Sequence, residues 1–394
     1  MPKVYPFKAL RPVPEFVGKV SAKSSDFANQ NQLAEEIRTN PYTFHHVTKN
    51  HLNYSGAFQE PEKFLPFAAR FIQEMKQNKI LIKEELDAYY YYEQTRKDGK
   101  KFRGIIALCD LNDYKTNTIK KHEEIRPTRL QFLEELYKTT KVMGEPTLLA
   151  YKDKFDIDFD KAESLYSFTT IDGKHHFVSK ISDREDIKYL LQKFENIESF
   201  YIADGHHRSA SVEKFHSDYP ELDNALSLCF VLHEDELEIK PFHRLIKPVL
   251  KMELDDLIER LSSNFKILKI ETPLYNPERK GDFGLYIENE WFKLESKHSS
   301  DKMDILILED EIVKKIFNIE NSRTDSQIAF HPHTEGLTSL LDLVDTQTFE
   351  IAITTKPCSF PEVRKVSDEQ RVLPAKSTFI EPKLRAGVII QEFI

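Results

Sequence analysis

The sequence has no apolar run long enough to cross a membrane. Its apolar stretches, such as 104–109 and 305–308, are far shorter than the roughly 20 residues that span a bilayer. The first residues, Met1-Pro2-Lys3-Val4-Tyr5-Pro6, lack the apolar core of a secretory signal peptide. We therefore expect a soluble cytoplasmic protein without a membrane partner.

Clustered positive charge and cysteine are also scarce. The formal net charge is −9, and no basic block or Lys/Arg stripe stands out, which argues against a general nucleic-acid binder. Small anions would instead need a local site. The three cysteines, Cys109, Cys229 and Cys358, are widely spaced, and we interpret them as reduced thiols in or near the core.

The chain of 394 residues exceeds what one hydrophobic core usually organises, so two or three domains are expected. We place an N-terminal α+β region at 1–115, a core region at 116–249 and a C-terminal α+β domain at 250–394. Apolar periodicity and turn residues predict the elements. Strands are expected at 88–93, 104–109, 147–151, 199–203 and 225–232, and helices near 62–77, from Pro127 onward, at 184–196, at 209–217 and from Leu254.

The clearest chemical signal is a strand that ends at Asp204 and turns through Gly205 into a helix. Such a joint presents backbone N–H groups and the positive end of the helix dipole, which suits an anion. Gly205 would allow the ligand to approach closely. His206, His207 and Arg208 add donors in the first turn. Capping alone would explain Asp204 but not three successive imidazole or guanidinium groups, so we favour a phosphate site over a solvated surface.

A second candidate is Glu123, which follows His122 just ahead of the helix from Pro127. Its carboxylate could serve as a general base. Acidic residues before a helix more often stabilise its first turn, and the local pattern by itself favours that interpretation.

Two further polar groups mix cations with His, Ser or Thr in ways suited to phosphate or carboxylate contacts. The first is His243-Arg244, and the second comprises Lys376, Ser377, Thr378 and Lys383. An exposed loop and a polar edge strand explain these groups equally well.

Four segments together resemble the domain-of-unknown-function 1015 family: 6–12, 122–123, 202–208 and 374–383. The middle of that family is similar to the ParB/sulfiredoxin superfamily. The resemblance implies an α/β (α+β) fold in which a ParB/sulfiredoxin-like mixed-sheet core is flanked by an N-terminal α+β layer and a C-terminal α+β domain. Ser209 departs from the usual Tyr, and of a usual Pro-Pro-Tyr-Asp segment only Asp26 is retained, which leaves substrate choice open.

Members of the superfamily that phosphorylate free serine are similar at the same elements. The resemblance therefore implies a small-molecule kinase that uses ATP or ADP with Mg²⁺ and an amino-acid acceptor, with L-serine favoured. Glu123 would be the base, with His122 beside it, and Asp204 would help hold substrate or magnesium. Gly205, His206, His207 and Arg208 would contact the nucleotide phosphates.

Two rival functions stay open at this point. A ParB-like module would bind a nucleotide or DNA without transferring phosphate, although the net acidity argues against DNA. A metal-dependent phosphoesterase or nuclease would use His206, His207 and His243, but no carboxylate-rich metal site is evident in the sequence.

Overall fold

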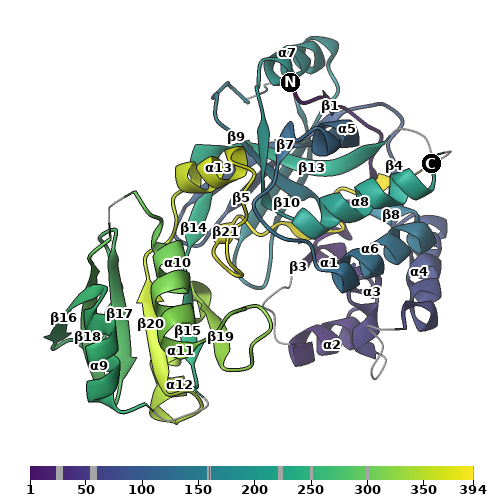
Figure 1. Ribbon diagram of the computed structural model, residues 1–394. Helices are drawn as coiled ribbons and strands as arrows, with labels where there is room; N and C mark the ends of the chain where they lie inside the picture. Colours follow the sequence, from purple (N-terminus) through teal and green to yellow (C-terminus); the bar gives the residue numbers. More distant parts are fainter. Residues whose placement is uncertain are drawn as a thin grey trace. The chain divides into compact units, whose positions relative to one another are not determined.

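The computed structural model describes residues 1–23, 30–53, 60–157, 159, 161–220, 225–248, 252–298 and 301–393. The chain forms two compact units (Figure 1). Unit 1 contains Met1–Leu237 and Pro382–Ile394, and unit 2 contains Glu238–Glu381. None of the helices in these ranges has the length and apolar character that crossing a bilayer requires.

A large mixed sheet forms the centre of unit 1, in the order β10-β11-β5-β6-β13-β9-β12-β7 with β1 beside β6. β9 runs parallel to β13, and β7 runs parallel to β12, whereas the other neighbours are antiparallel. The central strands are buried along almost their whole length, as expected for a sheet covered on both faces. The strands are β1 (Val4–Tyr5), β5 (Tyr89–Thr95), β6 (Lys101–Asp110), β7 (Ile119–Lys120), β9 (Thr147–Tyr151), β10 (Glu163–Thr169), β11 (His175–Ile181), β12 (Phe200–Asp204) and β13 (Leu226–His233).

Unit 1 also contains a set of helices. They are α1 (Val17–Val20), α2 (Gln30–Thr39), α3 (His45–Thr48), α4 (Leu65–Gln77), α5 (Leu111–Lys115), α6 (Pro127–Thr140), α7 (Arg184–Glu195) and α8 (His206–Asp218). Helices α6 and α8 pack side by side (Figure 1). Phe194 of α7 and Ala210 of α8 join Leu149 and Ile202 of the sheet in one buried apolar cluster, which holds both helices on the strands.

The C-terminal segment returns to unit 1 after the chain has passed through unit 2. Its strands β22 (Arg385–Ala386) and β23 (Gln391–Glu392) pair with β3 (Ala22–Lys23) and β8 (Val142–Met143). Backbone hydrogen bonds of this kind fix the path of a segment closely. Residues 382–393 are therefore held against unit 1, and Lys383 belongs to it.

Unit 2 contains a smaller antiparallel sheet in the order β16-β18-β17-β20-β15-β19 and a separate β14-β21 pair. Leu340 and Val344 of α12 pack on Tyr286 and Trp291 of the sheet. The strands are β14 (Glu238–Lys240), β15 (Phe242–Ile246), β16 (Phe265–Ile270), β17 (Asp282–Ile287), β18 (Glu290–Ser296), β19 (Ile328–Pro332), β20 (Ile351–Thr355) and β21 (Phe379–Glu381). The helices are α9 (Leu254–Ser262), α10 (Asp304–Ile307), the π-helix at Leu308–Lys314, α11 (Lys315–Phe317), α12 (Gly336–Asp345) and α13 (Phe360–Asp368).

The mixed α/β class agrees with the sequence-based expectation, and each predicted helix and strand has a counterpart within a few residues. The division of the chain differs from the three regions 1–115, 116–249 and 250–394. β5 and β6 lie in the same sheet as β9 and β12, so residues before 115 share one core with residues after it. Unit 2 also begins earlier, at Glu238.

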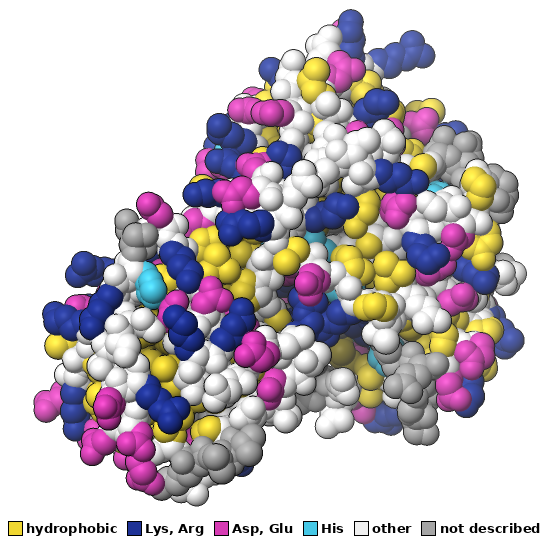
Figure 2. Space-filling view, viewed as in Figure 1, with side chains coloured by type: hydrophobic (Ala, Val, Ile, Leu, Met, Phe, Trp, Pro, Cys, Tyr) yellow, Lys and Arg dark blue, Asp and Glu magenta, His cyan; other side chains and the backbone are white. Residues whose placement is uncertain are grey.

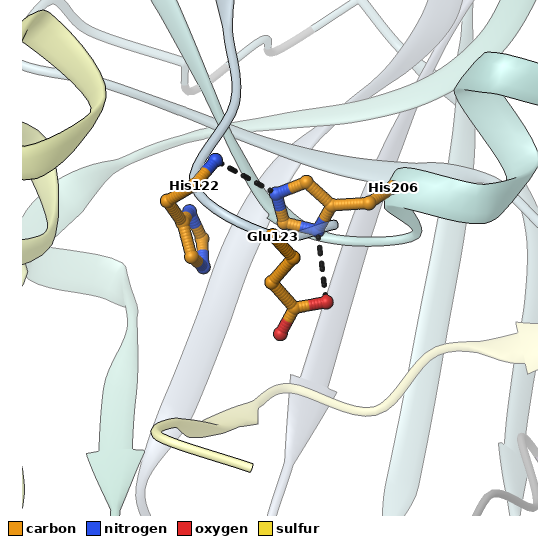
Figure 3. A group of neighbouring side chains, drawn as sticks. All are labelled: His122, Glu123 and His206. Carbon is orange, nitrogen blue, oxygen red and sulfur yellow. Dashed lines mark hydrogen bonds and ion pairs between the residues drawn. The ribbon is translucent and has the colours of Figure 1, made fainter. Parts of the chain in front are cut away.

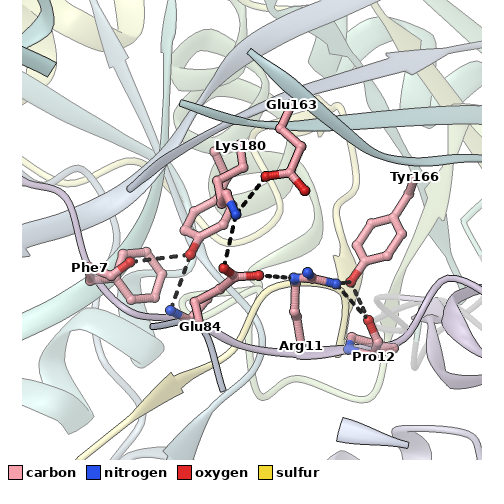
Figure 4. Close-up of polar contacts among 9 residues, drawn as sticks. Phe7, Arg11, Pro12, Glu84, Glu163, Tyr166 and Lys180 are labelled. Carbon is pink, nitrogen blue, oxygen red and sulfur yellow. Dashed lines mark hydrogen bonds and ion pairs between the residues drawn. The ribbon is translucent and has the colours of Figure 1, made fainter. Parts of the chain in front are cut away.

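A buried polar network ties the N-terminal segment to the sheet of unit 1 (Figure 4). Arg11 of β2 (Leu10–Pro12) pairs with Glu84 and donates to the Tyr166 hydroxyl at 3.1 Å. Glu84 also pairs with Lys180 at 3.2 Å, and Lys180 reaches Glu163 at 2.6 Å. Burial disfavours charges unless they are paired, so the largely buried Arg11, Glu84 and Lys180 depend on one another, whereas Glu163 is exposed. The Arg of the early family segment is thus a structural anchor.

Candidate functional site

The candidate site lies beyond the ends of two neighbouring parallel strands. β7 leads directly to His122 and Glu123, and β12 ends at Asp204. The two strands pair in parallel, with Phe200 opposite Ile119 and Tyr201 opposite Lys120. Parallel neighbours deliver their carboxyl ends to the same edge of a sheet, which is where ligands bind in many α/β proteins. The strand pairing therefore brings the two predicted segments together.

Gly205 makes the sharp turn between β12 and α8. Its φ is 99°, in the left-handed region that only glycine adopts readily, and no side chain caps the helix. Asp204 is thus the last strand residue and not the helix cap. A Cβ on Gly205 would lie 2.7 Å from the guanidinium of Arg208, so Arg208 packs directly against the glycine.

We expect Gly205→Ala to destabilise the protein by about 2–3 kcal/mol, because backbone strain is added to displacement of the Arg208 guanidinium from its ion pairs with Asp204 and Glu145. Gly99→Ala is the matched control: Gly99 has a φ of 85°, but a Cβ there meets nothing within 4 Å, so about 1 kcal/mol is expected. Urea unfolding measures both variants. Equal losses of stability in the two variants would show that a Cβ at position 205 does not disturb Arg208.

Two carboxylates and two cations form a compact ion-pair cluster beside this turn. Arg208 contacts Asp204 at 3.1 Å and Glu145 at 2.5 Å, and Lys383 contacts the other Asp204 oxygen at 3.2 Å. Burial alone would raise the pKa of Asp204, but the charges of Lys383 and Arg208 outweigh it and hold that pKa below its usual range. The carboxylate of Asp204 is therefore ionised and neutralised by its own chain.

The histidines of the first turn of α8 fasten the segment that carries Glu123. The backbone N–H of His122 donates to Nε2 of His206 at 3.3 Å, and the backbone N–H of Arg126 donates to Nε2 of His207 at 2.9 Å. Each imidazole thus accepts a hydrogen bond from the segment between β7 and α6. The three groups expected to contact phosphate, at 206, 207 and 208, all have partners within the chain.

His122, Glu123 and His206 lie together (Figure 3). Glu123 Oε2 is 3.4 Å from Nδ1 of His206, and the Glu123 side chain is 37% exposed, whereas both imidazoles are buried. The His122 and His206 rings meet edge to face with centroids 4.4 Å apart. Burial lowers the pKa of each histidine to about 3, so both rings are neutral near pH 7. Neither ring nitrogen of His122, nor Nδ1 of His206, has a hydrogen-bond partner among the described residues.

Among the described residues, this trio is the one group whose ligand atoms could surround a metal ion. Two imidazoles and one carboxylate suit zinc, iron or manganese, whereas Mg²⁺ prefers oxygen ligands. The trio thus does not fit the expected Mg²⁺, and Asp204 is already paired with two cations. These residues do not form a preformed magnesium site.

Glu123 does not stabilise the first turn of α6, contrary to what its local pattern favours. The helix begins at Pro127 after the cap residue Arg126, and its first turn contains no acidic residue. Glu123 precedes the helix by four positions and faces His206 instead. Its position therefore favours a role in the site.

His243 and Arg244 belong to unit 2, where both are completely buried on β15. This position contradicts the exposed-loop interpretation. Arg244 donates to the carbonyl oxygens of Phe242, Ala375 and Lys376 at 2.9–3.3 Å, and burial lowers its pKa to about 10. Its guanidinium thus holds the turn before β21.

The C-terminal family segment is divided between the units. Lys376, Ser377 and Thr378 lie in unit 2 before β21, and the Ser377 hydroxyl donates to the carbonyl of Pro374 at 2.7 Å. Lys383 lies in unit 1, on Asp204. The interpretation of β21 as an edge strand agrees with its pairing to β14 alone in a two-stranded sheet. Asp26 lies outside the described residues.

Sequence reasoning missed Glu145 and Thr147. Glu145 precedes β9, whose first residues lie opposite the end of β12, and it reaches Arg208 from there. The Thr147 hydroxyl lies 3.1 Å from that of Ser209, which is buried. The sequence around these residues predicts only a strand that follows a proline, and this pattern does not show which strand will pair with it.

A cavity of about 20 Å³ bounded by Arg208, Glu145 and Tyr137 has room for little more than one water.

Fold and site together define a mixed α/β protein with a His-Glu-His group and an ion-pair cluster at the ends of two parallel strands. The chain belongs to the DUF1015 family, described as proteins of unknown function, whose model matches residues 4–319. No curated protein matches the chain.

Solved structures give distant similarities. A free serine kinase in complex with ADP is 14% identical with a TM-score of 0.39, over 73% of this chain and 91% of that one. SbnI from Staphylococcus aureus is 12% identical with a TM-score of 0.41, over 72% and 85% of the two chains. A conserved hypothetical protein from Pyrococcus furiosus is 15% identical with a TM-score of 0.38, over 73% and 95%.

Proposed function

We propose that the protein is a small-molecule kinase that transfers a phosphoryl group from ATP or ADP to an amino-acid hydroxyl, with free L-serine as the favoured acceptor. The observation that carries this proposal is the position of Glu123. Its partly exposed carboxylate faces the Asp204–Arg208 turn and contacts His206 at 3.4 Å. A base in this position can accept the hydroxyl proton as the oxygen attacks phosphorus.

The phosphate-binding part of the proposal rests on the start of α8 and on two cations. No side chain caps this helix, so its amino end is suited to an anion. Lys383 and Arg208 both pair with Asp204, and a bound phosphate could contact the same two cations. Phosphoryl transfer depends mostly on positioning and charge neutralisation, which cations and a helix amino end supply.

Mg²⁺ would neutralise nucleotide phosphate when bound, but the described residues offer it no oxygen-rich site. Asp204 holds cations already, and the other candidate group contributes two nitrogens. The residues of this chain therefore act here as a base, as phosphate contacts and as supports for both.

The direct test incubates the purified full-length protein with ATP or ADP and each amino acid, and detects phosphorylated products by phosphorus NMR. O-phosphoserine formed with one nucleotide but not without protein would support the proposal. Absence of any phosphorylated acceptor, with nucleotide binding intact, would favour a module that binds nucleotide without transfer.

We expect Lys383→Met to weaken nucleotide binding about 10- to 100-fold, because a charge-assisted phosphate contact contributes roughly 1.5–3 kcal/mol. Isothermal titration calorimetry with ADP or ATP measures the change. Lys101→Met is the control, since Lys101 also pairs with a carboxylate, Glu93 at 3.0 Å, but on the β5-β6 hairpin. Equal affinity in Lys383→Met and the unmodified protein would remove Lys383 from the phosphate site.

The rival functions have less support. On the face shown in Figure 2, positive and negative side chains are interspersed over most of the surface, which does not favour a DNA-binding module. A metal-dependent phosphoesterase would use the His122, Glu123 and His206 group. That group is the specific observation in its favour, but the hydrogen bond that Nε2 of His206 accepts from the His122 backbone does not favour a metal ion on this ring.

A further inference from the structure

His206 is held between two groups that require opposite hydrogen-bonding roles from its ring nitrogens. On one side, the backbone N–H of His122 can only donate, and it points at Nε2 from 3.3 Å. On the other side, the Glu123 carboxylate can only accept when ionised, and it lies 3.4 Å from Nδ1. A neutral imidazole has one donor nitrogen and one acceptor nitrogen. The surroundings therefore select the form with the proton on Nδ1.

The ring is also fixed in orientation. His206 is 2% exposed, and the His122 ring packs edge to face against it. A rotation that exchanged nitrogen and carbon positions would break both polar contacts at once (Figure 3). The imidazole is thus a rigid link between the backbone at position 122 and the carboxylate at position 123.

The same geometry argues against a metal ion on this group. A metal bound at Nδ1 needs the lone pair of that nitrogen, so the proton of the neutral ring would move to Nε2. Two donors, Nε2–H and the His122 N–H, would then face each other at 3.3 Å. Histidine ligands normally donate from the other nitrogen to an acceptor, and here that position is filled by a donor.

We propose that His206 is a positioning residue: its Nδ1–H, directed by the His122 backbone, donates to Glu123 and holds this carboxylate toward the Asp204–Arg208 turn. This role differs from a contact with nucleotide phosphate and from metal ligation. It rests on the proposed function for the part played by Glu123 in turnover. At 3.4 Å, Nδ1 of His206 and Oε2 of Glu123 do not form a hydrogen bond in this structure, and such contacts in free enzymes often tighten when substrate binds.

The tautomer can be measured without any activity assay. Nitrogen-15 NMR of the full-length protein labelled at histidine would identify the signals of His206, among 14 histidines, by their loss in His206→Gln. We expect a neutral ring with the proton on Nδ1 and a shift of that signal in Glu123→Gln. A proton on Nε2, or a stoichiometric transition metal that is lost in His206→Gln, would overturn the proposal. This measurement decides the point even if the protein transfers no phosphate.

A double-mutant cycle then tests the link to turnover. The side chain introduced by His206→Gln can place its amide oxygen near the position of Nε2 and so keep the contact with the His122 backbone N–H. It cannot at the same time supply a donor to Glu123 in place of Nδ1–H. We expect His206→Gln alone to lower kcat about 10- to 100-fold with little change in nucleotide KM. In a Glu123→Gln background, His206→Gln should have almost no further effect on kcat, because the carboxylate that His206 positions is already absent. Additive losses, or a loss confined to nucleotide KM, would overturn the positioning role.

Discussion

Glu123→Gln is expected to lower turnover by about 100-fold or more while nucleotide affinity barely changes. Gln keeps the size of the side chain and most of its hydrogen bonding, but it cannot accept the hydroxyl proton. The change should therefore act on the chemical step and not on binding. Turnover is measured by phosphorus NMR or by coupled detection of the nucleotide product, and affinity by calorimetry.

Glu124→Gln is the matched control for this experiment. Glu124 is the next residue in the chain and is exposed, so the same charge is removed from the same segment. We expect its turnover to stay within about twofold of the unmodified protein, since surface changes usually have small effects. If both variants lose activity equally, the loss reflects the charge of the segment and not a base at Glu123.

Arg11→Met is expected to lower the free energy of unfolding by about 3 kcal/mol, because removal of one partner leaves charged and polar groups buried without compensation. Arg11 and Glu84 are only 10% and 9% exposed. Lys180 would still pair with Glu84, so we expect the lower end of the range for a broken buried pair. Urea or thermal unfolding measures the loss.

Arg38→Met provides the comparison for Arg11. Arg38 also pairs with a glutamate, Glu35 at 2.6 Å, but the two side chains are 72% and 55% exposed on α2. Exposed pairs of this kind contribute little, so no measurable change in stability is expected. A loss at Arg11 no larger than that at Arg38 would mean that the network in Figure 4 does not anchor the N-terminal segment.

The local elements of the site were accessible from the sequence because their signals are local. Apolar β-rich residues before Asp204 and the glycine after it predict a strand, a sharp turn and a helix. These elements are β12, Gly205 and α8 in the structure. The strand β7 was not predicted, because it consists of only two residues and forms no periodic pattern. Its pairing with β12 nevertheless determines where Glu123 lies.

Partners of the charged side chains could not be predicted for a different reason. A sequence shows which groups are able to donate or accept, but not which of them meet after folding. His206, His207 and Arg208 form a donor-rich run suited to phosphate, yet the fold gives them the partners His122, Arg126 and Glu145. Each of these contacts joins segments more than 60 residues apart in the sequence. The order of the strands in the sheet, and not the local sequence pattern, decides which of these segments come together.

By itself, the sequence determined the mixed α/β class, most helices and strands, the turn at Gly205 and the family to which the chain belongs. Periodicity, turn residues and local motifs carry this information along the chain. Only the tertiary structure decided that Glu123 faces His206, that Lys383 returns to Asp204 after the passage through unit 2, and that Arg244 is a buried support. These contacts follow from strand pairing and from the need of buried polar groups for partners, which depend on the whole fold.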